Sequence, residues 1–134
     1  VEGDLTTPKG IFNLGNIYYR SDRVQKPFSK LKSISIKKNM GWCDDPNSKF
    51  YNKLIKIKKN LKISHEKLYR KDHKYDFFIL IKYNYKNPIK LKGSAIFLHL
   101  TKNYLPTKGC IALCEKDFLI LAKLINKKTK IKIN

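Results

Sequence analysis

Short apolar runs separated by turn-forming residues dominate the hydrophobic pattern of this chain. Six runs have the length and composition of β-strands, at residues 10–14, 34–36, 54–57, 76–83, 94–99 and 130–133. The runs near 34–36 and 130–133 alternate apolar and polar residues, as half-buried strands do. By contrast, residues 77–81 are continuously apolar, which predicts a central strand buried on both faces.

One segment near the C-terminus has clear helical periodicity. Residues 115–126 carry acids in the first turn and a one-sided apolar face made of Phe118, Leu121, Ala122 and Ile125. A weaker candidate helix is 64–69, with Ser64 as N-cap but Lys67 where a capping box has Glu. Short strands with one late helix predict a mainly β sandwich or barrel, folded as a single domain over residues 1–134.

The charge is strongly basic. Lys and Arg total 30 against 10 acids, for a formal net charge of +20, and all but three of the basic residues are Lys. Such a charge attracts polyanions. However, bidentate contacts to phosphates and bases favour Arg, and these lysines are scattered along the chain, so the composition is a poor match to a nucleic-acid-binding protein. Solvated surface lysines from an AT-rich genome explain the composition more simply, with attraction to an anionic cell envelope as the alternative. The longest apolar run is strand-sized, so we expect no membrane span.

The candidate chemistry lies in a histidine and a cysteine that follow consecutive β-type segments. His99 ends the run Ile96-Phe97-Leu98, and Cys110 follows Gly109 after a loop rich in turn-forming residues. A nucleophilic cysteine needs a base within hydrogen-bond reach and backbone N–H groups that can hold an oxyanion. On spacing alone, a buried cysteine with an incidental histidine is an equally good interpretation.

The other cysteines and histidines give weaker signals. Cys43 and Cys114 form no metal-ligand spacing with Cys110, so we expect no metal and no cofactor, and we leave open whether they are buried thiols or a pair. His65 and His73 stand in a Lys-rich stretch and are expected at the surface.

Three segments, in the same order along the chain, resemble one known family. TKGCI at residues 107–111, with a strand-borne histidine upstream, is similar to the signature of the L,D-transpeptidase catalytic domain (YkuD-type) family. GDLTTPKGIF at 3–12 is similar to an early turn and strand of that family, and GWCDDP at 41–46 resembles a segment of one bacterial branch. The chain departs from most members at Lys108, where His is usual, and at Ala112, where Arg or Asn is common.

The resemblance implies a β-sandwich capped by helix and an enzyme that acts on peptidoglycan stem peptides through a cysteine thioester. It implies Cys110 as nucleophile and His99 as base, with the imidazole oriented by a backbone carbonyl for which Leu100 is the candidate. The N–H groups of Gly109 and Cys110 would form the oxyanion hole, and Lys108 with the general positive field should favour the thiolate. Family domains usually have strands before this point, so we expect an N-terminally trimmed fragment of a periplasmic or cell-envelope protein. We expect it to be a monomer.

Candidate substrate-binding residues are Trp42, Asp44, Asp45, Thr107 and Lys108. The two adjacent acids could grip the amine of an acyl acceptor, although Asp-Asp-Pro-Asn is also strong turn chemistry. Two alternatives to a transpeptidase remain open: an L,D-carboxypeptidase that uses water as acceptor, and a non-catalytic basic module that binds nucleic acid or wall polymer.

Overall fold

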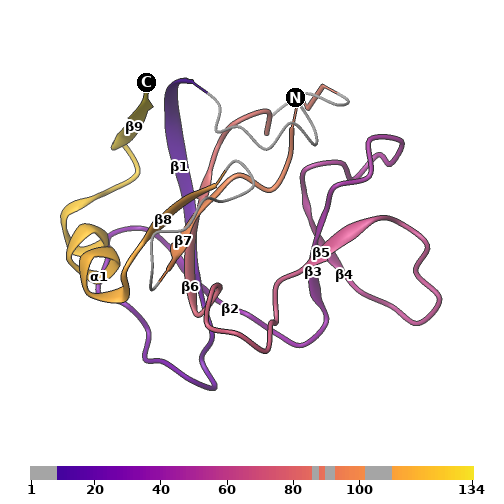
Figure 1. The fold of residues 1–134 in the computed structure, drawn as a ribbon, viewed down its shortest axis with the longest axis horizontal. Helices are drawn as coiled ribbons and strands as arrows, with labels where there is room; N and C mark the ends of the chain where they lie inside the picture. The colour runs from indigo at the N-terminus through magenta and orange to yellow at the C-terminus, as the bar shows by residue number, and fades with distance from the viewer. Residues whose placement is uncertain (1–8, 86–87, 90–92, 102–109) are drawn as a thin grey trace.

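The computed structural model describes residues 9–85, 88–89, 93–101 and 110–134, and its strands form two sheets (Figure 1). The main sheet has the order β2-β1-β6-β7-β8, and β9 pairs with the start of β1. Its strands are β1 (Gly10–Tyr19), β2 (Ser33–Ser35), β6 (Phe77–Ile81), β7 (Phe97–Leu100), β8 (Ile111–Leu113) and β9 (Lys130–Ile133). The smaller sheet has the order β4-β3-β5, from β3 (Met40–Cys43), β4 (Leu54–Lys56) and β5 (His65–Lys67).

The pairing is mixed. β1 with β2 and β7 with β8 are parallel, whereas β1–β6, β6–β7 and β1–β9 are antiparallel. The register of β1 against β6 shifts between Leu14 and Ile17, and Gly15 lies in this irregular stretch. A Cβ atom at Gly15 would stand 3.0 Å from the Leu80 side chain, so the glycine permits the close approach of the two strands.

Two apolar cores lie on opposite faces of the main sheet, because side chains alternate along each strand. Phe77, Ile79 and Ile81 face the first core, which the helix α1 (Glu115–Leu124) covers through Phe118 and Ala122. Phe78 and Leu80 face the second core, which residues of the smaller sheet cover (Figure 1). The prediction of a strand buried on both faces is thereby confirmed, since all five residues of β6 are buried.

The mainly β fold and the single helix near the C-terminus, among the described residues, are as predicted. The candidate helix at 64–69 is wrong: these residues contain β5, which pairs with β3. The segment lacks the acid of a capping box, and its pairing with β3 supplies the backbone hydrogen bonds that a short helix would have made. The sequence reading also missed β3 and β8, and it ended β1 five residues early, at the turn signal of Gly15.

Asn52 ties the smaller sheet to the main one. Its Oδ1 accepts hydrogen bonds from Trp42 Nε1 at 2.8 Å and from the Ala95 N–H at 3.1 Å. Its Nδ2 donates to the carbonyl oxygens of Tyr83 at 3.0 Å and of Asn84 at 2.6 Å. The backbone of Asn52 has φ 57°, a left-handed conformation that asparagine tolerates better than most residues. One buried amide therefore fixes the junction between the sheets.

Replacing this amide should destabilise the protein strongly. Asn52→Ala removes both hydrogen-bond functions and leaves buried partners unpaired, so we expect the free energy of unfolding to fall by about 3 kcal/mol in urea titrations. Asn47→Ala, at an exposed position of the neighbouring turn, is the matched control and should change it by less than about 0.5 kcal/mol. Equal effects of the two substitutions would contradict the role given to Asn52.

Candidate active site

Cys110 immediately precedes β8 and lies in the second core, 9% exposed. Its Sγ accepts a hydrogen bond from the Phe97 N–H at 3.4 Å and donates one to the Ala95 carbonyl oxygen at 3.3 Å. Ala95 has φ 53°, which is uncommon for a residue with a side chain. A strained backbone position therefore lies directly against the thiol, as is frequent at functional sites.

The strand register brings His99 to the same face as Cys110. β7 and β8 run parallel, with Leu98 opposite Ile111 and His99 opposite Ala112. Because side chains alternate along both strands, Phe97 and His99 share a face with Cys110 and Ala112. The histidine and the cysteine predicted from the sequence are therefore near neighbours on one face of the sheet.

The imidazole of His99 is held in one tautomer. Its Nδ1 lies 2.8 Å from the carbonyl oxygen of Leu100, and a carbonyl oxygen can only accept, so Nδ1 carries the proton. Nε2 then has a free lone pair. This atom is buried and finds no hydrogen-bond partner among the described residues. A buried acceptor left without a partner is uncommon and is consistent with a base awaiting its proton donor.

Burial keeps both groups neutral at pH 7. It lowers the pKa of His99 to about 4, which the bond to Leu100 opposes and the positive charges of Lys74 and Arg70 reinforce. Burial raises the pKa of Cys110 to about 11, although the Phe97 N–H and Lys74 favour the thiolate. Lys74 thus favours the thiolate, as expected of a positive field, but desolvation outweighs this effect and the thiol stays protonated.

Two residues next to His99 were not predicted from the sequence. The ring of Tyr75 packs against the His99 imidazole, with centroids 5.8 Å apart and planes at 69°. Its hydroxyl donates a hydrogen bond to Oε1 of Glu66, which lies on β5. Both residues come from a Lys-rich stretch without a recognisable motif, so only the folded arrangement reveals them.

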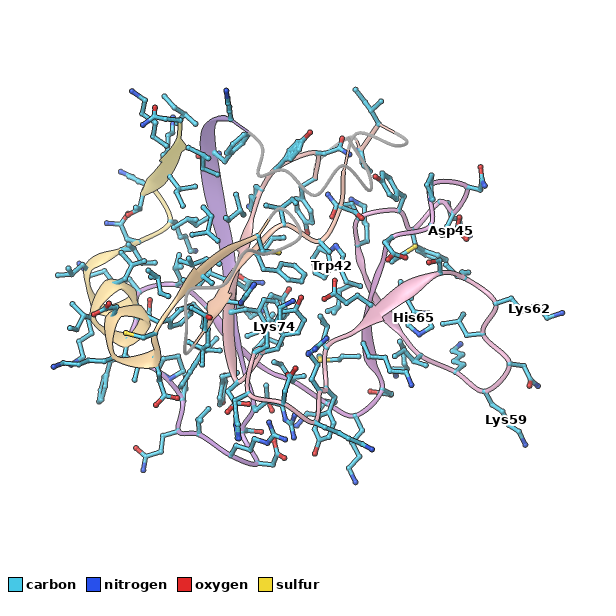
Figure 2. The ribbon with its side chains drawn as sticks, in the orientation of Figure 1. Trp42, Asp45, Lys59, Lys62, His65 and Lys74 are labelled. Atoms are coloured by element: carbon cyan, nitrogen blue, oxygen red, sulfur yellow. The ribbon has the colours of Figure 1, made fainter. Side chains whose placement is uncertain are left out.

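Trp42 packs between the sheets, and the adjacent acids form a turn. The Trp42 ring meets Phe97 edge-on, with centroids 5.3 Å apart. Asp45 Oδ1 accepts a hydrogen bond from the Asn47 N–H at 2.9 Å, and Asp44 Oδ1 accepts one from the Ser64 hydroxyl at 2.6 Å. Figure 2 shows Asp45 at the outer end of the smaller sheet, away from the main sheet. These contacts account for the turn, and substrate binding by the two acids stays a prediction.

Three predicted site residues, Thr107, Lys108 and Gly109, lie outside the described residues. The proposed oxyanion hole and the contribution of Lys108 therefore stay predictions. No disulfide bond joins any two of Cys43, Cys110 and Cys114, all of which the structure describes, so Cys43 and Cys114 are not a disulfide pair. His73 is exposed and His65 is partly exposed.

Within the described part of the chain, no three His, Cys, Asp or Glu side chains gather as metal ligands would. No helix in that part combines the length and the apolar composition that crossing a membrane requires.

The neutral, buried imidazole should make stability depend on pH. The unfolded chain binds a proton at His99 near pH 6.5, whereas the folded chain does so only near pH 4, so stability should fall as the pH drops between these values. The expected loss is up to about 3 kcal/mol. Urea titrations at pH 7.5 and 4.5 should show this extra loss in the wild type relative to His99→Gln. Parallel pH dependence in the two proteins would contradict it.

Comparison with known proteins identifies the family of the chain. The family model for the L,D-transpeptidase catalytic domain (YkuD) matches residues 1–133. No curated protein and no solved structure gives a significant match. Enzymes of this family are cysteine-dependent and act on peptidoglycan, in keeping with a buried thiol and an imidazole on one sheet face. On a match that spans nearly the whole sequence, the chain belongs to the L,D-transpeptidase catalytic domain family.

Proposed function

We propose that this domain transfers acyl groups between peptidoglycan stem peptides through a thioester on Cys110, with His99 as base. The observation that carries the proposal is the free lone pair of His99 Nε2, buried on the same sheet face as the thiol. The family match supports the substrate class, because the family is named for this transfer. The site of action would be the periplasm or cell envelope, where peptidoglycan lies.

The neutral pair favours proton transfer during attack rather than a preformed ion pair. As Sγ attacks the carbonyl carbon of the donor peptide, its proton passes to His99 Nε2. The Leu100 carbonyl stabilises the resulting imidazolium through Nδ1–H. His99 then protonates the leaving nitrogen, the C–N bond breaks, and a terminal D-amino acid departs. N–H groups of Gly109 and Cys110 would stabilise the oxyanion by a few kcal/mol, about 3 for a single donor.

In the second half of the reaction, an amine attacks the thioester and forms the cross-link. Water in place of the amine gives an L,D-carboxypeptidase, so the two activities share the first step and differ in the acceptor. Trp42, Asp44, Asp45, Thr107 and Lys108 remain candidates for substrate contacts. A purely binding role for nucleic acid or wall polymer would not require a single-tautomer histidine beside a thiol, and the match to a catalytic domain argues against it.

Cys110→Ala should abolish release of the terminal D-amino acid from a tetrapeptide stem, because the thioester cannot form. The fold should survive, since replacing a thiol by a hydrogen on the same Cβ is a small change. Cys114→Ala is the matched control and should retain activity, because Cys114 is the residue before α1. Intact-mass analysis with a carbapenem should give one adduct, on the peptide containing Cys110. Loss of activity in Cys114→Ala alone would contradict the assignment.

His99→Ala should reduce turnover at pH 7 by at least about 100-fold, the usual contribution of a general base. Because the two residues act as one unit, combining it with Cys110→Ala should lower activity no further than Cys110→Ala does. His73→Ala is the control, at an exposed histidine, and should be close to wild type. Steady-state release assays test both points, and an active His99→Ala protein would remove this residue as the base.

A further inference from the structure

The pairing of β3 with β5 directs Glu66 toward the proposed active site. Trp42 stands directly opposite Glu66 in this antiparallel pair, and opposite residues share a face of the sheet. The Trp42 side chain belongs to the same core as Cys110 and Phe97, so that face is turned to the main sheet. Figure 2 shows Trp42 between the two sheets, with His65, the neighbour of Glu66, on the smaller one.

Tyr75 holds the Glu66 carboxylate in this position. The buried phenol donates a hydrogen bond to Oε1, and its ring packs against His99. The charge of Glu66 acts on the Cys110 thiol, whose pKa it raises in addition to the effect of burial. Tyr75 therefore contacts both the Glu66 carboxylate and the His99 imidazole, and the carboxylate is close enough to Cys110 for its charge to act on the thiol.

This carboxylate is unexpected if Cys110 is the nucleophile, because a negative charge opposes formation of the thiolate. The hydrogen bond from Tyr75 does not require a charge, since a neutral amide oxygen would accept it equally well. Glu66 is only partly buried. Its hydrogen bond from Tyr75 uses one of its two oxygens, and it makes no hydrogen bond to another described residue. Arg70 is close enough for its charge to interact with Glu66, but its guanidinium donates its hydrogen bonds to Asp72. One oxygen of Glu66 therefore remains available to a cationic ligand in the second half of the reaction.

We infer that Glu66, positioned by Tyr75, binds the ammonium group of the acyl acceptor beside the thioester. The inference rests on the proposed function and adds the group that selects an amine over water. Primary amines are largely cationic at neutral pH, and a chain of net charge +20 repels them. A local carboxylate offsets this repulsion at the place where the amine must attack.

The transfer step balances as follows. The bound ammonium loses one proton to solvent and becomes an amine, whose nitrogen attacks the thioester carbonyl. The C–N bond forms and the C–S bond breaks. The second proton passes from nitrogen through His99 to the sulfur, which leaves as the Cys110 thiol. The products are the amide, the free thiol and one released proton.

Glu66→Gln is the sharpest test, because it removes the charge and keeps an oxygen that can accept from Tyr75. With a tetrapeptide donor and a peptide carrying a primary amine as acceptor, we expect the ratio of transfer to hydrolysis to fall at least tenfold. Release of the D-amino acid should be no slower, and its pH profile should move to lower pH, since the thiol loses a negative neighbour. Glu66→Asp should recover part of the ratio, and Glu115→Gln, at an exposed helix position, should match wild type.

Hydroxylamine provides an acceptor that is uncharged at pH 7.5. Its capture of the thioester should be unchanged in Glu66→Gln, whereas capture by the cationic amine should fall. A ratio that is unchanged in Glu66→Gln, or equal losses with both acceptors, would overturn the inference and leave Glu66 a structural partner of Tyr75. If wild type releases the D-amino acid but transfers to no amine, this inference falls and acyl transfer to water stands. If wild type releases nothing and forms no adduct, the proposed function itself falls.

Discussion

The antiparallel pairing of β6 with β7 is the constraint on which the rest of the molecule depends. Both strands are buried throughout, so each must supply apolar side chains to two faces at once. Leu98 and Leu100 pack toward the helix, and Phe97 packs toward the smaller sheet. His99 follows the same alternation and therefore lies on the Phe97 face. The core thus determines which face carries the imidazole.

The same burial determines the electrostatics of the site. Removing His99 and Cys110 from water disfavours the charged form of each, which lowers one pKa and raises the other. A thiol and an imidazole that are both neutral can exchange a proton only when the substrate makes the transfer favourable. The Leu100 carbonyl fixes which nitrogen can receive it. In the reaction proposed here, desolvation would make proton transfer from Cys110 to His99 depend on bound substrate.

The smaller sheet contributes the second wall of the site, and polar contacts join it to the first. Asn52 connects Trp42 with the Ala95 N–H, and the Ala95 carbonyl accepts the hydrogen bond from the Cys110 thiol. On the neighbouring strand, Glu66 meets the Tyr75 hydroxyl. Lys59 and Lys62 lie farther out, at the end of the β4–β5 connection (Figure 2). The described lysines, which give the chain most of its positive charge, are all exposed or partly exposed.

The sequence by itself determined the elements whose signals are local. Period-two alternation located β9, continuous apolarity identified β6 as a central strand, and helical spacing placed α1 with its buried Phe118 and Ala122. Short-range motifs also singled out His99 and Cys110 and led to the family. Only the tertiary structure decided the rest. β3, β5 and β8 are three or four residues long and gain stability from partners distant in sequence, so their own residues carry little signal. The contact of Glu66 with Tyr75, the protonation of His99 and the raised pKa of Cys110 depend on burial and on strand register, which no local pattern encodes.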